Sequence, residues 1–157
     1  VIENRFAGAH PPWDDAGAQY AGDVGVYETM KLRLLNGSHS AIAYLGFLMG
    51  HATVWQAAGD RLLATFIERM MHDEIVPTLV APPGVDLAGY CNTLLARFRN
   101  AALPHRTQQI AMDGSQKLPQ RLLGTIRDRR RDGREHADGG HAARERRRRL
   151  ERSHARD

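Results

Sequence analysis

The fold of this chain is decided by one long apolar stretch, which reads Val24-Gly-Val-Tyr-Glu-Thr-Met-Lys-Leu-Arg-Leu-Leu-Asn-Gly-Ser-His-Ser-Ala-Ile-Ala-Tyr-Leu-Gly-Phe-Leu-Met-Gly-His51. Apolar side chains occur at nearly every angle around a helix, so the stretch predicts a single helix from about Val24 to His51 that is buried at the centre of its domain. Gly37 lies inside this helix, where glycine costs about 1 kcal/mol relative to alanine. We therefore expect a ligand or a second backbone to approach closely at Gly37.

The polar side chains in this stretch include Lys31, Asn36 and His39, which are five and three residues apart. At 100° per residue, Asn36 lies about 140° and His39 about 80° from Lys31, so all three fit one broad face of the helix. An amine can pass a proton, an amide can donate to a developing oxyanion, and an imidazole can orient a substrate oxygen. The pattern predicts a site for interconverting a carbonyl and an alcohol.

Two further helices follow from capping residues and apolar periodicity. Asp60 can cap a helix from Arg61 to about Glu74, and Asp86 can cap another that runs to about Arg99. Both segments repeat apolar residues at spacings of three and four, which indicates one inward-facing stripe on each helix.

The rest of the body contains breaks in regular structure. Residues 1–22 are rich in proline and glycine and predict an irregular entry segment. Residues 110–126 read as short helical pieces, broken around Asp113 and again at Pro119. No alternating strand pattern is present, so the predicted fold class is all-α.

Size and composition indicate a globular protein. The chain has 157 residues, of which 42% are hydrophobic and 25% charged. The longest apolar run, residues 41–50, is far shorter than the ~20 residues that span a membrane, so no membrane association is expected. No signal peptide is recognisable, and the single cysteine, Cys91, excludes an internal disulfide. These features favour a cytoplasmic location.

Positive charge is concentrated at the carboxyl end. Residues 127–157 contain twelve Arg and seven Asp or Glu, a net of +5, whereas the whole chain carries +4. We expect residues 127–157 to form a disordered Arg-rich tail, or to be a frameshifted sequence that replaces the native helices. No aromatic residue accompanies these arginines, and the body has no basic patch, so nucleic acid is not an expected partner.

The segment Tyr27–Ser40 resembles the catalytic segment of the mannitol dehydrogenase family, which comprises zinc-independent, long-chain polyol dehydrogenases. The resemblance continues to Gln109-Ile-Ala-Met-Asp-Gly-Ser-Gln-Lys-Leu-Pro-Gln-Arg121 and covers about residues 1–126. It implies two domains, a Rossmann-type domain that binds NAD and a helical C-terminal domain that carries the catalytic lysine. No Gly-x-Gly-x-x-Gly motif occurs in the chain. Residues 1–126 are therefore expected to be part of the helical catalytic and substrate domain, with the Rossmann-type domain absent and the chain inactive by itself.

The same resemblance implies roles for the polar residues of the central helix. Lys31 would be the general acid and base, buried against Leu34, Leu35 and the cofactor. Asn36 would donate its amide N–H to the substrate oxygen, and His39 would position that oxygen or an adjacent hydroxyl. Glu28, one turn before Lys31, would pair with the lysine or relay its proton to solvent; an ordinary surface ion pair is the alternative.

Residues 105–117 are expected to close the substrate pocket through His105, Arg106, Gln109 and Lys117. Mannitol-oxidising members of the family carry an arginine eight residues before the lysine, where this chain has Gln109. This segment is more similar to the branch that interconverts D-mannonate and D-fructuronate. Arg106 could hold the carboxylate of such a substrate with two hydrogen bonds, or could be a surface arginine at a helix end.

The predicted function is therefore that of an NAD-dependent oxidoreductase acting on a small sugar acid or polyol. A mannitol 2-dehydrogenase or related polyol dehydrogenase is the near alternative, and a non-enzymatic helical module whose basic tail binds acidic partners is an alternative of another class. No metal site is expected, because the histidines of the body and Cys91 show no paired ligand spacing. The sequence indicates no oligomeric state.

Overall fold

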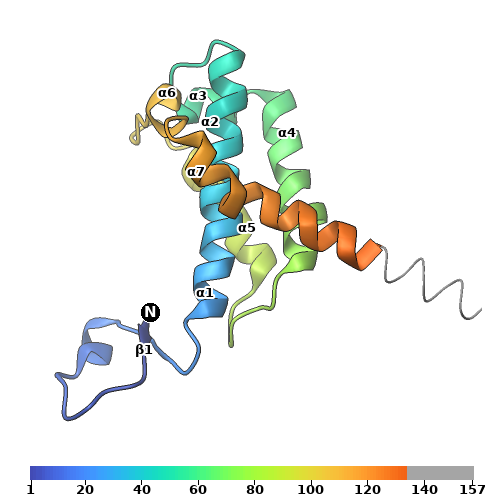
Figure 1. Cartoon of the computed structure of the whole chain (residues 1–157). Coiled ribbons are helices and arrows are strands. Elements are labelled where there is room, and N and C mark those ends of the chain that lie inside the picture. Colours follow the sequence, from blue (N-terminus) through green and yellow to red (C-terminus); the bar gives the residue numbers. More distant parts are fainter. Residues whose placement is uncertain (134–157) are drawn as a thin grey trace, which may run out of the picture.

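The computed structural model describes residues 1–133 and shows a bundle of helices around one central helix (Figure 1). Three segments follow one another without a break to form this central helix: α1 (Gly25–Met30), the π-helical η2 (Lys31–Gly37) and α2 (Ser38–Leu48). The predicted helix from Val24 to His51 is confirmed. Its internal change of helix type was not predicted.

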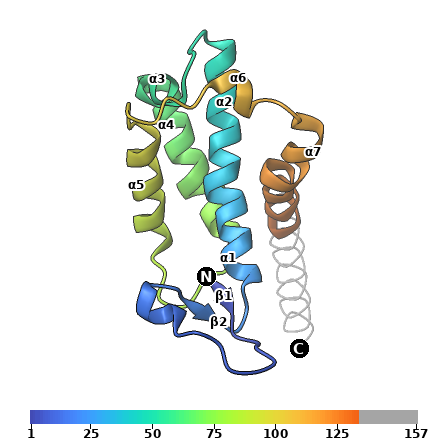
Figure 2. The same ribbon diagram turned by 90° about the vertical axis from the view of Figure 1, so that its left-hand side faces the viewer.

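Helices from the middle of the chain cover one side of the central helix (Figure 2). They are α3 (Val54–Gly59), α4 (Arg61–Arg69), η3 (Met70–Ile75), η4 (Val76–Thr78) and α5 (Leu87–Phe98). Asp60 and Asp86 both act as predicted caps, since their carboxylates accept backbone N–H groups of the first turns of α4 and α5. The predicted helix to Glu74 is present, although its last part, η3, is π-helical.

Helix α3 was not predicted, yet the sequence carries a signal for it. Thr53 and Gln56 form a capping box in which the Gln56 side chain accepts the Thr53 backbone N–H at 3.1 Å. A threonine followed three residues later by a glutamine is the sequence pattern of this box.

The other side of the central helix is covered by the last described segments: α6 (Thr107–Ile110), α7 (Gly114–Leu118), the π-helical η5 (Pro119–Leu123) and helical residues 124–133. The predicted break at Asp113 is confirmed, because this residue has a left-handed φ of 59°. The predicted break at Pro119 is wrong. Proline is tolerated where its fixed φ suits the helix, and Pro119, with φ −54°, begins the π-helical segment that continues α7.

Residues 127–133, which were expected to begin a disordered tail, are helical and attached to the body. The Arg33 guanidinium lies 2.6 Å from the Asp128 carboxylate and also donates to the Thr78 hydroxyl at 2.9 Å. Arg129 donates to Glu74 at 3.2 Å. The tail therefore cannot begin at Arg127, and the remainder of the predicted tail, 134–157, lies outside the described residues.

The entry segment, residues 1–22, contains little regular structure, as predicted, but it is not wholly irregular. Strand β1 (Ile2–Glu3) pairs in parallel with β2 (Tyr20–Ala21), with the 3₁₀ helix η1 (Trp13–Ala16) between them. Two-residue strands are too short to show an alternating pattern. The all-α class is confirmed, with this small sheet as its one addition in the part of the chain that the structure describes.

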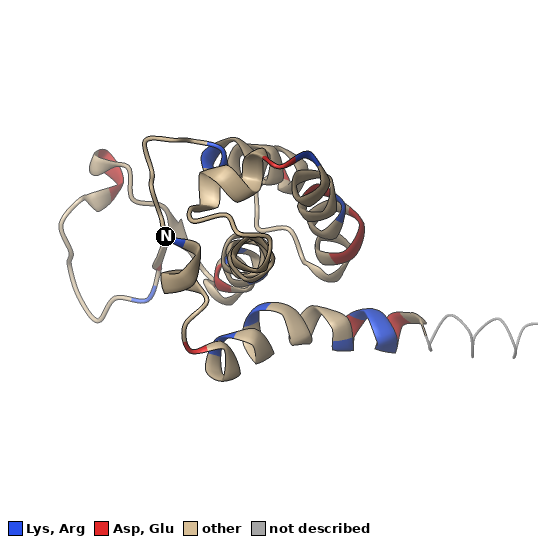
Figure 3. Cartoon of the chain, turned by 90° about the horizontal axis from the view of Figure 1, so that it is seen from above, with Lys and Arg blue, Asp and Glu red and all other residues tan. Residues whose placement is uncertain are grey.

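The core lies between the central helix and the helices packed on it. Leu34 and Ile42 of the central helix are completely buried against Ile67, Met71 and the free thiol of Cys91. Figure 3 looks down the central helix and shows most charged residues on the surrounding segments. The central burial that the sequence predicted is confirmed for this part of the helix, whereas its end, at Phe47–Leu48, is exposed.

Candidate functional site

The candidate site is built on the π-helical segment η2, which begins at Lys31 and ends at Gly37. A π-helix is hydrogen-bonded from residue i to i+5, so residues five apart stand above one another, as residues four apart do in an α-helix. Lys31 and Asn36 have this spacing. His39 follows three residues later in α2, on the same face by α-helical spacing. The change of helix type therefore brings Lys31 and Asn36 closer to one face than the α-helical estimate of about 140°. Short π-helical segments occur frequently at functional sites.

The expected close approach at Gly37 is confirmed, and the approaching group is a second backbone. A Cβ atom added to Gly37 would stand 2.6 Å from the carbonyl oxygen of Arg121 in η5. The guanidinium of Arg121 also donates to the Ser40 hydroxyl at 3.0 Å. The two π-helical segments thus cross in contact at this glycine, which fixes η2 against the last described helix.

A small cavity of about 130 Å³ lies beside η2. It is bounded by the central helix, by the end of α5 and by the loop that precedes α6. Its walls are formed by Leu35, Asn36, His39, Val54, Arg97, Phe98, Leu103 and His105. The structure therefore brings together three predicted site residues, Asn36, His39 and His105, from segments that are far apart in the sequence.

The electrostatic environment of His39 keeps its imidazole neutral near neutral pH. The ring stacks on Phe98 with 5.6 Å between centroids and lies 5.8 Å from the His105 ring. Burial, followed by the charges of His105, Arg121 and Arg97, lowers the pKa of His39 to about 4. Its Nε2 atom is buried and has no hydrogen-bond partner among residues 1–133. A neutral imidazole with a free nitrogen is suited to orienting a substrate oxygen.

Lys31 and Glu28 lie on the open side of the central helix. Both side chains are exposed, and no ion pair joins them in the described structure. The expected burial of Lys31 against Leu34 is absent, because Leu34 points into the core and is completely buried there. Any burial of Lys31 must come from groups outside these residues.

Three residues of the predicted pocket-closing segment do not reach the cavity. Arg106 is exposed, and its backbone forms an antiparallel bridge with Thr53. Gln109 is exposed on α6. The ammonium of Lys117 donates to the Met112 carbonyl at 2.8 Å and lies 3.3 Å from the Asp113 carboxylate, so it is engaged by its own turn.

Two arginines near His39 were not predicted as site residues. Arg97 lines the cavity from the last turn of α5, and Arg121 lies at the crossing of the π-helical segments. No spacing in the sequence relates either residue to His39, because α5 and η5 meet η2 only through the tertiary fold. The capping and periodicity that revealed α5 gave no reason to select Arg97 from its other exposed residues.

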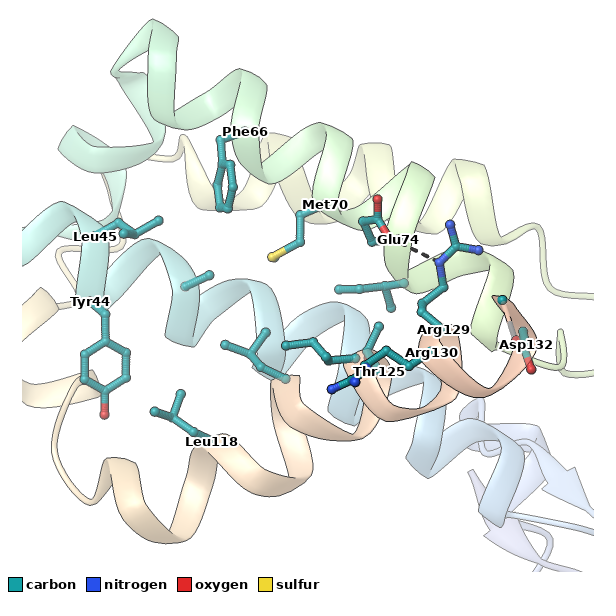
Figure 4. A pocket seen from close by; sticks show the side chains of 15 residues that line it. Tyr44, Leu45, Phe66, Met70, Glu74, Leu118, Thr125, Arg129, Arg130 and Asp132 are labelled. Carbon is teal, nitrogen blue, oxygen red and sulfur yellow. Dashed lines mark hydrogen bonds and ion pairs between the residues drawn. The ribbon is translucent and has the colours of Figure 1, made fainter. Parts of the chain in front are cut away.

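A much larger hollow lies elsewhere in the described structure. An apolar groove of about 1060 Å³ runs between α2, α4 and the helix that continues α7, with Tyr44, Phe66 and Met70 among its walls (Figure 4). The Glu74–Arg129 pair closes one end. No residue proposed for chemistry from the sequence lines this groove, so its size does not identify it as the catalytic site.

Neither a metal centre nor a membrane span is indicated within residues 1–133. These residues contain no group of three or more His, Cys, Asp or Glu side chains placed to hold a metal ion. None of their helices combines the length and apolar character needed to cross a bilayer.

Comparison with known proteins finds similar sequences in one family of dehydrogenases. The family model of the mannitol dehydrogenase C-terminal domain matches residues 23–138. The D-mannonate oxidoreductase of Escherichia coli is 50% identical over 127 residues, which are 81% of this chain and 26% of that protein. The chain thus spans about a quarter of the length of the curated relatives it matches.

Solved structures agree with the sequence matches. A D-sorbitol dehydrogenase in substrate-free form superposes with a TM-score of 0.80 at 35% identity. The mannitol 2-dehydrogenase of Pseudomonas fluorescens, solved as a ternary complex with NAD and D-mannitol, superposes with a TM-score of 0.77 at 39% identity. Each superposition covers 83% of this chain and 27% of the other.

Proposed function

The chain belongs to the mannitol dehydrogenase family, and on that premise we propose that it forms the substrate-handling helical part of an NAD-dependent oxidoreductase. Because the family consists of dehydrogenases, the alternative function, a non-enzymatic helical module that binds acidic partners, has no support. The chain corresponds to only about a quarter of its relatives, so the cofactor is assigned mainly to a domain outside it. The observation that supports the proposal is the spacing of Lys31 and Asn36 along the π-helical η2, with His39 three residues further on in α2.

The chemistry divides between the cofactor and the chain. A nicotinamide cofactor, when bound, supplies or accepts the hydride at the substrate carbon. The described residues fit this arrangement in one respect: the Lys31 face is exposed and free of ion pairs, so a second domain can cover it. They contain no strand–turn–helix of the kind that binds a dinucleotide, and we assign no cofactor contact to them.

The chain's own residues handle the proton and the substrate oxygen. In the reductive direction Lys31 Nζ gives a proton to the carbonyl oxygen as that oxygen gains electrons, and the lysine is left neutral. Asn36 donates its amide N–H to the same oxygen and stabilises the developing charge. The neutral His39 ring orients the oxygen or an adjacent hydroxyl, and Glu28, one turn before Lys31, passes the replacement proton from solvent.

For the substrate we propose a six-carbon sugar acid, with interconversion of D-mannonate and D-fructuronate. The identity to D-mannonate oxidoreductase is 50%, whereas the identity to fungal mannitol 2-dehydrogenases is 40–41%. Gln109 also stands where mannitol-oxidising members carry an arginine. A polyol such as D-mannitol is the alternative substrate.

The test is a domain exchange, because the chain alone is expected to be inactive. The matched segment of E. coli D-mannonate oxidoreductase is replaced by that of this chain, and NADH oxidation is measured with D-fructuronate. We expect activity that falls about 10²–10⁴-fold in Lys31→Ala, the usual contribution of a positioned acid or base. An active exchange protein that is insensitive to Lys31→Ala would contradict the proposed mechanism.

The same exchange in P. fluorescens mannitol 2-dehydrogenase separates the two substrates. If this segment prefers a sugar acid, activity with D-fructuronate relative to D-fructose rises in the exchange protein. Retained activity with fructose and none with fructuronate in both hosts would favour the polyol alternative.

A further inference from the structure

The cavity beside η2 is lined by polar and apolar side chains in equal number. Four of its eight wall residues, Asn36, His39, Arg97 and His105, carry side-chain nitrogen, and the other four are apolar. Asn36 and His39 are half-buried, whereas Arg97 and His105 are exposed at the mouth. We propose that this cavity is a subsite for the carboxylate end of a sugar acid, and that Arg97 holds the carboxylate with His105 beside it. The inference rests on the proposed function and deepens it by identifying the group that selects the substrate.

The nitrogen atoms that line the cavity are available to a ligand. Neither the guanidinium of Arg97 nor the amide of Asn36 has a hydrogen bond or ion pair within residues 1–133. The buried Nε2 of His39 is also without a partner there. Buried polar groups are nearly always hydrogen-bonded, and leaving one unpaired costs about 1–3 kcal/mol. A ligand oxygen would satisfy the buried His39 nitrogen, and the exposed guanidinium of Arg97 is accessible to the same ligand.

The charge around the cavity favours an anion. No Asp or Glu lines it, whereas Arg97 lies at its mouth. The charges of Arg97 and Arg121 both reach His39 and help to keep its imidazole uncharged. Since a guanidinium presents parallel N–H groups that match the two oxygens of a carboxylate, Arg97 is suited to bind one.

The size of the cavity indicates that it accepts one end of a substrate. Pockets for whole small ligands usually measure about 300–1,000 Å³, and this cavity measures about 130 Å³. Lys31 and Asn36 lie about one turn apart in the π-helical η2, because they have its i to i+5 spacing. The ketone and the carboxylate of D-fructuronate are four carbon–carbon bonds apart, about 5 Å when extended. A sugar acid can therefore place its carboxylate at Arg97 with its ketone toward Lys31.

Arg97 replaces the arginine that the sequence favoured for this role. The side chain of Arg106 is exposed and absent from the cavity wall, although its neighbour His105 is present. The backbone bridge between Arg106 and Thr53 holds this part of the loop in place, with His105 rather than Arg106 at the mouth.

The experiment measures binding to the 157-residue chain with D-mannonate and D-mannitol as probes, which differ in the carboxylate. Imidazole NMR signals of His39, assigned from their loss in His39→Asn, report occupancy of the cavity. We expect D-mannonate to bind at least tenfold more tightly than D-mannitol, and Arg97→Gln to abolish this preference. Arg97→Lys should retain part of it.

Two matched variants serve as controls. Arg99→Gln removes a positive charge two residues further on, at the residue that caps the end of α5. Arg106→Gln removes the arginine that the sequence favoured, and both variants should keep the preference for D-mannonate. Binding of both probes with a ratio that Arg97→Gln leaves unchanged would overturn the assignment of Arg97 while leaving the proposed function intact. If neither probe perturbs His39, the assignment of this cavity as a substrate subsite fails, whereas the proposed function is still tested separately by the domain exchange.

Discussion

Gly37 lies against the backbone carbonyl of Arg121 so closely that even one added carbon atom would collide with it. A Cβ at Gly37 would stand 2.6 Å from that oxygen and 3.5 Å from a side-chain carbon of Leu122. Since Gly37 ends the π-helical segment that begins at Lys31, this contact joins the proposed catalytic face to η5. The site is thus positioned by a backbone crossing as well as by its own helix.

Replacement of Gly37 by alanine should destabilise the chain. Overpacking costs about 1–3 kcal/mol, and alanine returns up to about 1 kcal/mol of helix propensity, so we expect a net loss of about 1–2 kcal/mol in the free energy of unfolding. Urea denaturation followed by circular dichroism measures this loss. The matched control is Gly124→Ala, because a Cβ there meets only ordinary contacts at 3.7 and 3.8 Å. Equal effects of the two variants would contradict the close crossing.

Loss of the Asp128 carboxylate should release the last described helix from the body. The Arg33–Asp128 pair is largely buried, with 15% and 27% of the two side chains exposed. Removing one partner leaves the other charge unpaired, and for a partly buried pair we expect a cost of about 1–3 kcal/mol. In Asp128→Ala the amides of residues 124–133 should therefore exchange hydrogen faster, by about tenfold or more.

The control for this prediction is an exposed ion pair. Arg69 and Asp73 lie 3.5 Å apart on the surface, with 78% and 59% of their side chains exposed. Such pairs contribute little, so Arg69→Ala should change amide exchange by no more than a small factor. Unchanged exchange in Asp128→Ala would show that residues 124–133 are held by other contacts.

Local signals in the sequence predicted those parts of the fold that local interactions determine. The continuous apolar pattern located the central helix, and Asp60 and Asp86 marked the starts of α4 and α5 because an N-cap acts on its own first turn. Gly37 predicted a close contact because glycine destabilises the interior of a helix. A glycine there indicates that a neighbouring group leaves no room for a side chain.

The features that the sequence did not predict depend on tertiary contacts or on the type of helix. The charged residues from Arg127 onward suggest disorder by composition, yet Arg33 and Glu74 provide partners that the sequence does not place nearby. Arg97 could not be chosen as a site residue, because only the packing of α5 beside the central helix brings it to the cavity of His39. The π-helical segments have no recognised sequence pattern, so the angle between Lys31 and Asn36 was calculated for the wrong type of helix.

Acidification should destabilise the chain through His39. The folded state holds the pKa of this imidazole at about 4, compared with 6.5 for an ordinary histidine. Between these values the unfolded chain binds a proton that the folded chain does not, so this stabilisation is complete above about pH 6.5 and is lost as the pH falls to about 4. The full difference corresponds to about 3 kcal/mol, and partial exposure to solvent reduces the expected loss to about 1–2 kcal/mol.

Urea denaturation at several pH values tests this prediction. The free energy of unfolding of His39→Asn should depend less on pH across this range, by the same total of about 1–2 kcal/mol. An equal pH dependence in the parent chain and in His39→Asn would show that other groups are responsible.

Exposed apolar side chains along the large groove should make the chain self-associate. Phe66 and Ile126 line the groove and are 51% and 53% exposed, which is unfavourable for a surface in water. Burying one large apolar side chain contributes about 1.5–3 kcal/mol, so Phe66→Ser should weaken association by about tenfold or more, as measured by sedimentation velocity. Val80→Ser is the control, because Val80 is 75% exposed but lies outside the groove. A parent chain that stays monomeric at high concentration, or equal effects of both variants, would contradict a role for the groove in association.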